Sequence, residues 1–130
     1  MMAEKRNTNA RVRYAVVGLG WIAQEAVLPA FKHAQENSEL TALVSDDPEK
    51  LANLSQKYGV KRTFSYDEYD ECLRSGEIDA VFIALPNSLH KDYTVRAADA
   101  GIHILCEKPM SVTVEEAEAM IEAAERNQGN

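Results

Sequence analysis

A lysine lies between a carboxylate and a proline in Glu107-Lys108-Pro109, directly after a predicted buried strand. An ammonium group at this place could hydrogen-bond a substrate hydroxyl, and deprotonate or orient it, while hydride leaves the carbinol carbon. Glu107 could reach a cofactor ribose or hold the lysine. Taken alone, the tripeptide favours an exposed ion pair beside a turn. Its chemistry therefore depends on what surrounds it.

A second candidate is the turn Gly18-x-Gly20-x-x-Ala23, which separates an apolar stretch from a helical pattern. Gly18 permits the turn, Gly20 lets a pyrophosphate approach the backbone, and Ala23 lets the helix pack close to the strand. The pyrophosphate would lie on free N–H groups at the positive end of the helix dipole. Glycine turns after strands are common, so this motif needs support from the rest of the chain.

The residues after the next apolar stretch bear on the choice between NAD and NADP. An acidic side chain at this place would hold the adenosine ribose and repel a 2′-phosphate. Ser45 and Lys50 could instead bind a 2′-phosphate, whereas Asp46 could turn inward and select NAD. Asp46 could equally be solvated while Asp47 only caps its helix. We favour NADP and keep NAD as the alternative.

A further loop, Leu85-Pro86-Asn87-Ser88-Leu89-His90, is expected where a nicotinamide would rest. Pro86 stiffens this loop, Leu85 offers an apolar contact, and Asn87 can hydrogen-bond a ribose hydroxyl or the carboxamide. His90 either contributes to this site or belongs to the start of its helix. Cys106 is interpreted as a buried strand residue, because no histidine nearby would activate it as a nucleophile.

Strands and helices alternate along the whole sequence. Strands are predicted over residues 13–17, 40–44, 63–64, 80–85 and 102–106, and helices after each of them. The helix signals include Asp47 with Pro48 at a helix start, and capping boxes at Ser65–Glu68 and Thr113–Glu116. Pro29 should kink or restart the first helix. This alternation is typical of a doubly wound parallel α/β sheet.

Such a sheet brings its loops together at one edge. Right-handed crossovers place the carboxyl end of every strand on the same side, where ligands bind near the reversal of strand order. Four loops meet there, at residues 18–22, 45–47, 85–88 and 107–110. Their convergence favours a dinucleotide site well beyond the glycine motif alone.

Composition limits the class of protein and the partners that it can have. The chain has 130 residues, 45% of them hydrophobic, which is typical of one soluble domain over residues 12–130 behind a lead-in of residues 1–11. A net charge of −7 argues against binding nucleic acid or an anionic membrane. No stretch reaches the length of a membrane span, and a signal peptide explains residues 5–23 less well than a strand and turn. Two cysteines are too few for a disulfide framework, so we expect a reducing cytoplasm.

Several stretches together resemble one family. VVGLGxxA, ALVSDDPEK, IDAVFIALPNSLH and AGIHILCEKPMS are similar to the nucleotide-binding domain of the glucose–fructose oxidoreductase/inositol dehydrogenase/rhizopine-catabolism family, with the likeness covering about residues 12–127. The resemblance implies a Rossmann-type fold and hydride transfer between a nicotinamide cofactor and a sugar or polyol carbinol. It implies cofactor contacts at Gly18, Leu19, Gly20, Trp21, Ile22, Ser45, Lys50, Leu85, Pro86, Asn87, His90, Glu107, Lys108 and Pro109. It further implies that Lys108 is catalytic and that the Lys108–Pro109 bond is cis.

The chain departs from the family pattern in two respects. The NADP-using branch tends to have a small residue where this chain has Asp46. Family members also continue into a second α/β domain that holds the substrate, so we expect this chain to bind cofactor but not to turn over substrate alone. Self-association through the face that would meet that domain is expected. The alternatives are a stand-alone NAD(P)-binding or sensing module and a binder of adenosyl-methionine or coenzyme A.

Overall fold

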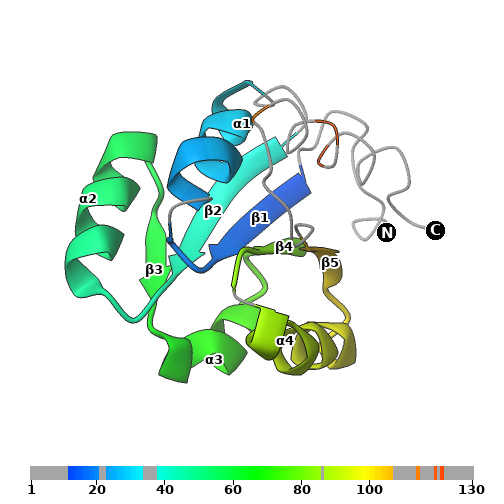
Figure 1. Cartoon of the computed structure of the whole chain (residues 1–130). Helices are drawn as coiled ribbons and strands as arrows, with labels where there is room; N and C mark the ends of the chain where they lie inside the picture. Colours follow the sequence, from blue (N-terminus) through cyan, green and yellow to red (C-terminus); the bar gives the residue numbers. More distant parts are fainter. Residues whose placement is uncertain are drawn as a thin grey trace.

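The computed structural model describes residues 12–20, 23–33, 38–85 and 87–106, with Val114, Ala119 and Ile121 beyond them. The predicted lead-in of residues 1–11 lies outside the described residues. Strands and helical segments alternate as the sequence predicts (Figure 1). The strands are β1 (Val12–Val17), β2 (Ser38–Val44), β3 (Arg62–Phe64), β4 (Ala80–Ile83) and β5 (His103–Cys106). The helical segments are η1 (Ala23–Val27), α1 (Leu28–His33), α2 (Pro48–Tyr58), η2 (Tyr66–Glu68), α3 (Tyr69–Leu73) and α4 (Asn87–Asp99).

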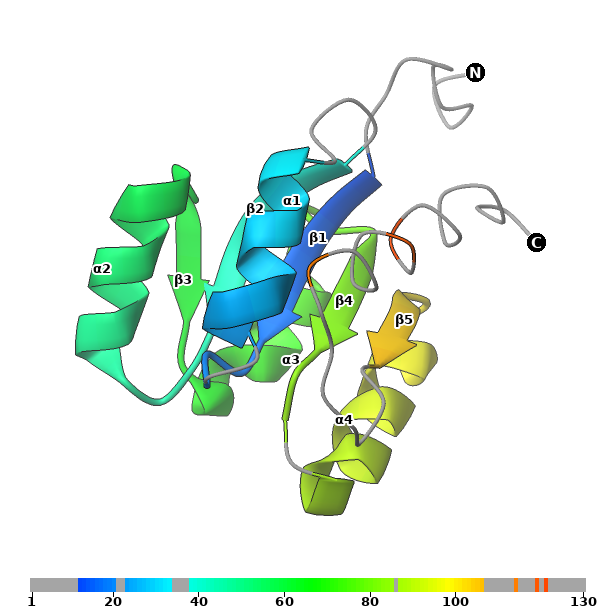
Figure 2. The same ribbon diagram turned by 45° about the horizontal axis from the view of Figure 1, so that its top comes forward.

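The strands form one parallel sheet in the order β3-β2-β1-β4-β5. Strand order reverses at β1, because the chain first moves outward to β2 and β3 and then returns to β4 on the other side. The confirmed prediction of a doubly wound α/β sheet therefore places the switch point at the carboxyl end of β1. The arrowheads in Figures 1 and 2 lie on the same side of the sheet.

Both faces of β1 are buried, as expected of a central parallel strand. Tyr14 and Val16 face one core cluster, which they share with η1 and α1, whereas Ala15 and Val17 face a second cluster with α3 and α4. The Tyr14 ring meets Phe31 of α1 edge to face, with ring centroids 4.9 Å apart. Helices therefore cover both faces of the sheet and leave its carboxyl edge to the loops (Figure 2).

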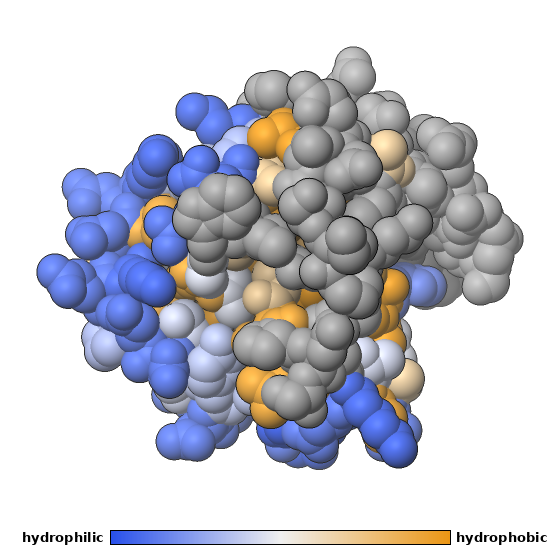
Figure 3. Space-filling view, in the orientation of Figure 1, coloured by the Kyte–Doolittle hydropathy of each residue, from blue (hydrophilic) through white to orange (hydrophobic). Residues whose placement is uncertain are grey.

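Helix α2 begins and ends at the residues that the sequence indicates. The Asp47 side chain accepts hydrogen bonds from two backbone N–H groups of the first turn, with Pro48 as the first helical residue. Gly59 ends the helix with a φ of 69° in the left-handed region, which glycine adopts without strain. The outer face of α2 is covered by hydrophilic residues, seen at the left of Figure 3.

The first helix changes type beside Pro29. The segment starts as the π-helical turn η1 and continues as the α-helix α1, in which Pro29 is the second residue. Proline has no N–H for the carbonyl four residues earlier, and its ring crowds that carbonyl, so a wider turn before it relieves the clash. The predicted kink or restart at Pro29 is thus a change of helix type.

The structure moves several predicted boundaries. The capping box at Ser65 and Glu68 is present, but it opens the 3₁₀ turn η2, and α3 ends at Leu73 rather than near Ser75. Strand β4 ends at Ile83, and α4 begins at Asn87 rather than at His90. Helical structure at these places begins or ends in single turns, where sequence signals are weakest.

The last described residues lie on the face of the sheet that α1 covers. Ile121 is fully buried in the first core cluster, and Val114 packs against it. Both residues are helical, in agreement with a helix after the fifth strand. The capping box predicted at Thr113–Glu116 lies outside the described residues.

Candidate functional site

Backbone hydrogen bonds tie the strand ends together at the carboxyl edge. The Gly18 N–H donates to the Val44 carbonyl over 2.9 Å, and the Ala84 N–H donates to the Val17 carbonyl over 2.8 Å. The Ser45 N–H donates to the carbonyl of Phe64 at the end of β3 over 3.0 Å. Three of the four predicted loops therefore begin side by side.

Gly18 is required by both its conformation and its surroundings. Its φ of 96° is one that residues with a side chain rarely adopt. A Cβ built on Gly18 would also lie 2.7 Å from the Ala84 carbonyl oxygen and 2.9 Å from Cδ2 of Leu85. The prediction that Gly18 permits the turn is correct, and the close approach of the residues after β4 adds a second reason. Its N–H is already bonded to the Val44 carbonyl of β2, so Gly18 contributes the shape of the loop and not a free donor.

Gly20 has the opposite environment. It is exposed, and a Cβ at this residue would meet no described atom within 4 Å. Leu19, between the two glycines, is 3% exposed and packs in the core beneath the loop. The loop therefore has an anchored inner side and an open outer side, as the predicted approach of a pyrophosphate to the backbone requires. Trp21 and Ile22 lie outside the described residues.

The loop after β2 is ordered by its own side chains. The Ser45 hydroxyl accepts a hydrogen bond of 3.1 Å from the Asp47 N–H, and Asp47 caps α2 as predicted. Ser45 is 3% exposed, whereas Asp46 and Lys50 are exposed. The Ser45 hydroxyl retains its proton for a further acceptor. The loop and the first turn of α2 thus carry one hydroxyl, one carboxylate and one ammonium within six residues.

Sequence reasoning missed Tyr66, which follows β3 at this corner. Burial raises the pKa of the Tyr66 phenol to about 12, and the negative charges of Asp46 and Tyr93 add to the effect. The ring meets Tyr93 of α4 edge to face at a centroid distance of 6.0 Å. Tyr66 therefore lies between the loop after β2 and α4. An aromatic residue two positions after the end of a strand of a parallel sheet is the signal that could have indicated it.

The predicted nicotinamide loop follows β4. Leu85 is buried and lies against Gly18. Asn87 and His90 both belong to the first turn of α4, so the helix itself starts at this loop. His90 is the fourth residue of α4, in agreement with the interpretation that it belongs to the start of its helix. Pro86 lies outside the described residues.

Strand β5 brings the chain to the same edge. Cys106 is its last residue and pairs in register with Ile83, the last residue of β4. Glu107, Lys108 and Pro109, together with the predicted cis bond, lie outside the described residues. In the sequence, the residues predicted to take part in catalysis therefore follow directly after the carboxyl end of β5.

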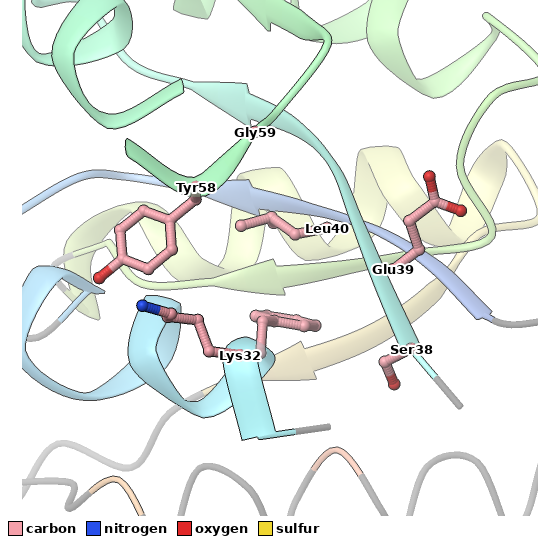
Figure 4. Close-up of a pocket in the computed structure, with 7 residues that line it drawn as sticks. Lys32, Ser38, Glu39, Leu40, Tyr58 and Gly59 are labelled. Carbon is pink, nitrogen blue, oxygen red and sulfur yellow. The ribbon is translucent and has the colours of Figure 1, made fainter. Parts of the chain in front are cut away.

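The other reactive features of the described residues lie away from this edge. A cavity of about 280 Å³ at the amino end of β2 is lined by Phe31, Lys32, Ser38, Glu39, Leu40, Tyr58 and Gly59 (Figure 4). There, Lys32 Nζ lies 5.9 Å from the centre of the Tyr58 ring. Burial raises the pKa of the Cys72 thiol to about 12, which makes it a poor nucleophile at neutral pH.

The described ranges offer neither a metal site nor a membrane-spanning helix. They contain no group of three or more His, Cys, Asp or Glu residues placed to hold a metal ion. They also contain no helix that is long and apolar enough to cross a membrane.

Comparison with known proteins agrees with this geometry. The D-xylose 1-dehydrogenase [NADP(+)] of Haloarcula marismortui is 39% identical over 125 residues, which make up 95% of this chain and 34% of the relative. The scyllo-inositol 2-dehydrogenase (NADP(+)) of Bacillus subtilis is 36% identical over 116 residues, or 89% of this chain and 34% of the relative. The chain spans about a third of the length of these curated relatives.

A solved structure and a family model agree with the same assignment. The crystal structure of the aldose-aldose oxidoreductase from Caulobacter crescentus, in complex with glycerol, matches with a TM-score of 0.69 and 43% identity. The match covers 89% of this chain and 35% of that protein. The family model described as "Oxidoreductase family, NAD-binding Rossmann fold" matches residues 12–130. The chain therefore belongs to the glucose–fructose oxidoreductase/inositol dehydrogenase/rhizopine-catabolism family of oxidoreductases.

Proposed function

We propose that this chain binds NADP at the carboxyl edge of its sheet, as the cofactor-binding domain of an oxidoreductase that acts on a sugar or polyol carbinol. The observation that carries the proposal is the pair of glycines after β1. Gly18 leaves no room for a side chain, and Gly20 leaves its outer side open, in a chain whose family binds NAD-type cofactors. A diphosphate on this loop would lie at the switch point of the sheet.

The adenosine half of the cofactor is proposed to lie over the loop after β2. Ser45 would donate its hydroxyl proton to the 2′-phosphate, and the exposed ammonium of Lys50 would neutralise its charge. The names of the xylose and inositol dehydrogenases compared above both specify NADP, which supports this choice. Asp46 argues against NADP, because its carboxylate would repel a 2′-phosphate nearby. Tyr66 would form the side wall of this corner.

The nicotinamide half is proposed to lie toward β4 and β5. Leu85 would contact the ring, with Pro86, Asn87 and His90 around it and Glu107 on the nicotinamide ribose. When bound, the cofactor supplies the hydride acceptor or donor. Lys108 would hold the substrate hydroxyl at its Nζ and accept or return its proton as the carbinol carbon changes oxidation state. Pro109 would set the direction of Lys108.

Turnover is proposed to need a second domain that holds the substrate. The matched relatives are about three times as long as the aligned region, which leaves room for such a domain. The proposed substrate class of this chain is inferred from its relatives, whose names specify a xylose, an inositol and an aldose. A stand-alone binding module without catalysis is the competing function. No turnover by the wild-type chain, assayed together with a second-domain fragment and a sugar, would favour that module. Full turnover by a Lys108→Ala variant in the same assay would instead remove Lys108 from its catalytic role.

Calorimetry on the chain tests cofactor binding directly. NADPH is expected to bind, and to bind more tightly than NADH. Gly20→Val would fill the open side of the loop without clashing with a described atom, so the fold should persist while binding is lost. Gly20→Ala is the matched control and should bind with intermediate affinity. A Gly20→Val protein that is folded and binds NADPH as tightly as the wild type would refute the proposed diphosphate position.

Self-association stays a prediction. Within the described ranges, the exposed large apolar side chains are Leu89 and Val95, both on α4. Sedimentation at increasing concentration tests the prediction, and a monomer at every concentration would contradict it.

A further inference from the structure

Gln24 holds two consecutive carbonyl groups of the glycine loop. Its side-chain Nε2 donates a hydrogen bond of 2.8 Å to the Leu19 carbonyl. Its backbone N–H donates a hydrogen bond of 3.1 Å to the Gly20 carbonyl. Gln24 is half-buried in the π-helical turn η1, directly below the loop. The side-chain bond is therefore a contact between η1 and the peptide that joins Leu19 to Gly20.

The direction of that peptide decides which way the Gly20 N–H points. In a trans peptide the N–H points opposite to the carbonyl of the same plane. Gln24 turns the Leu19 carbonyl inward, toward η1. The Gly20 N–H is consequently turned outward, on the exposed side of the loop, where the position of a Cβ is open. An outward N–H at this place is a donor for an anionic group.

The same peptide is fixed from below by the side chain of Leu19. Leu19 is 3% exposed and belongs to the core cluster that η1 and α1 share with β1. A turn with two glycines has high conformational freedom, which must be lost either on folding or on ligand binding. The buried Leu19 side chain and the Gln24 amide restrict the turn in the folded chain, so this freedom is lost on folding and not on binding. The Leu19–Gly20 peptide is thereby fixed before a ligand arrives.

We propose that Gln24 is a positioning residue that presents the Gly20 N–H to the diphosphate of the cofactor. This inference rests on the proposed function, because it needs the diphosphate to lie over the glycine loop. Gln24 acts through the Leu19–Gly20 peptide and does not itself touch the cofactor. Without the amide, the peptide is free to rotate, and binding then has to order it.

The test compares two ligands on the full chain. Gln24→Met keeps the length and bulk of the side chain but has no N–H to donate. The Kd for NADPH is expected to rise about fivefold, the effect of one lost hydrogen bond. Adenosine 2′-monophosphate lacks the diphosphate, so its Kd is expected to stay the same in both proteins. A general loss of structure would weaken both ligands alike.

Two more variants sharpen the test. Gln24→Glu places carboxylate oxygens against the Leu19 carbonyl, and it should weaken NADPH binding more than Gln24→Met. It also serves as the test variant if the methionine protein does not fold. Glu25→Gln changes the exposed neighbour on η1 and should leave both affinities unchanged.

The outcomes separate this inference from the function on which it rests. Equal NADPH affinity in the wild type and in both Gln24 variants would overturn the positioning role and leave the proposed function intact. An equal loss for both ligands would also overturn it, because Gln24 would then act on the whole fold. A wild-type chain that binds adenosine 2′-monophosphate but not NADPH would overturn the diphosphate position itself.

Discussion

The two ends of β1 are held by different means. At the carboxyl end, backbone hydrogen bonds of 2.9 Å and 2.8 Å join Gly18 to β2 and Val17 to the residue after β4. At the amino end, the side chain of Asp79 accepts from the Arg13 backbone N–H over 2.9 Å and from its guanidinium over 3.0 and 3.1 Å. Backbone hydrogen bonds join both ends, since the Asp79 N–H also donates to the Arg13 carbonyl over 2.7 Å, but only the amino end adds an ion pair.

This difference separates what stabilises the fold from what makes it useful. The Arg13–Asp79 pair joins β1 to the residue before β4. At the carboxyl end, where the strand order reverses, Gly18 lets the residues after β4 approach closely, and Gly20 leaves the outer side of the loop open. The amino end of β1, with its ion pair, stabilises the fold. The carboxyl end, with its glycines, forms the candidate site.

The largest effect is expected for Gly18→Ala. The new methyl group would lie 2.7 Å from the Ala84 carbonyl oxygen, and the residue would keep an unfavourable φ of 96°. Strain and overpacking together should lower the free energy of unfolding by about 3 kcal/mol. NADPH binding should be lost as the loops separate. Denaturant unfolding and calorimetry measure the two effects, and Gly76→Ala, at a glycine with open surroundings and a φ of 77°, controls for φ alone.

Gly18→Ala also tests whether the close approach matters. A loss no greater than that of Gly76→Ala would show that only backbone conformation requires a glycine at this position. The contact between Gly18 and the residues after β4 would then contribute little.

The next effect concerns the amino end. Asp79→Ala removes the acceptor of three hydrogen bonds from Arg13, two of them from its guanidinium. The free energy of unfolding should fall by about 2 kcal/mol, because the strand joint loses its charged hydrogen bonds. The affinity of the folded protein for NADPH should not change. Asp99→Ala, at an exposed residue of α4, is the control. A clear loss of NADPH affinity in folded Asp79→Ala would contradict the separation of the two ends.

The sequence predicted the architecture well because hydrophobic periodicity and caps are local signals. The strand order places the predicted loops together, and the cap at Asp47 and the stop at Gly59 are confirmed. Helix ends were less predictable: α4 begins at Asn87 and α3 ends at Leu73, away from the predicted ends at His90 and near Ser75.

The parts of the site that escaped prediction depend on contacts between distant segments. The clash that a Cβ at Gly18 would have with Ala84 joins residues far apart in the chain. The place of Tyr66 beside Asp46 depends on β2 and β3 lying next to each other. The bond from Gln24 to Leu19 arises from a π-helical turn, which no periodic pattern predicts.

A smaller effect is expected from the charges after β2. Lys50→Ala removes an exposed ammonium from the first turn of α2 and should raise the Kd for NADPH about fivefold, with no change for NADH. Lys57→Ala, in the last turn of the same helix, is the matched control and should change neither affinity. Asp46→Asn should act in the opposite direction and favour NADPH. Tighter binding of NADH than of NADPH by the wild type would refute the proposed roles of Ser45 and Lys50.

The smallest effect is a dependence of stability on alkaline pH. The phenol of Tyr66 has a pKa raised to about 12, against an ordinary value near 10 in the unfolded chain. Between these values the folded state keeps a proton that the unfolded state has lost. Stability is therefore fully present below pH ~10 and is lost as the pH rises toward ~12. Tyr66→Phe should show a shallower decline over this range in denaturant unfolding. Identical slopes for the two proteins would contradict the burial of this phenol.

The most direct measurement is a titration of the isotope-labelled chain with NADPH, followed by the backbone amide resonances. We expect the resonances of Gly20, Ser45 and Leu85 to move together as the cofactor binds, while those of Ser38 and Gly59 beside the amino-end cavity stay in place. Movement confined to Ser38 and Gly59, or no movement in a folded chain, would contradict cofactor binding at the carboxyl edge of the sheet.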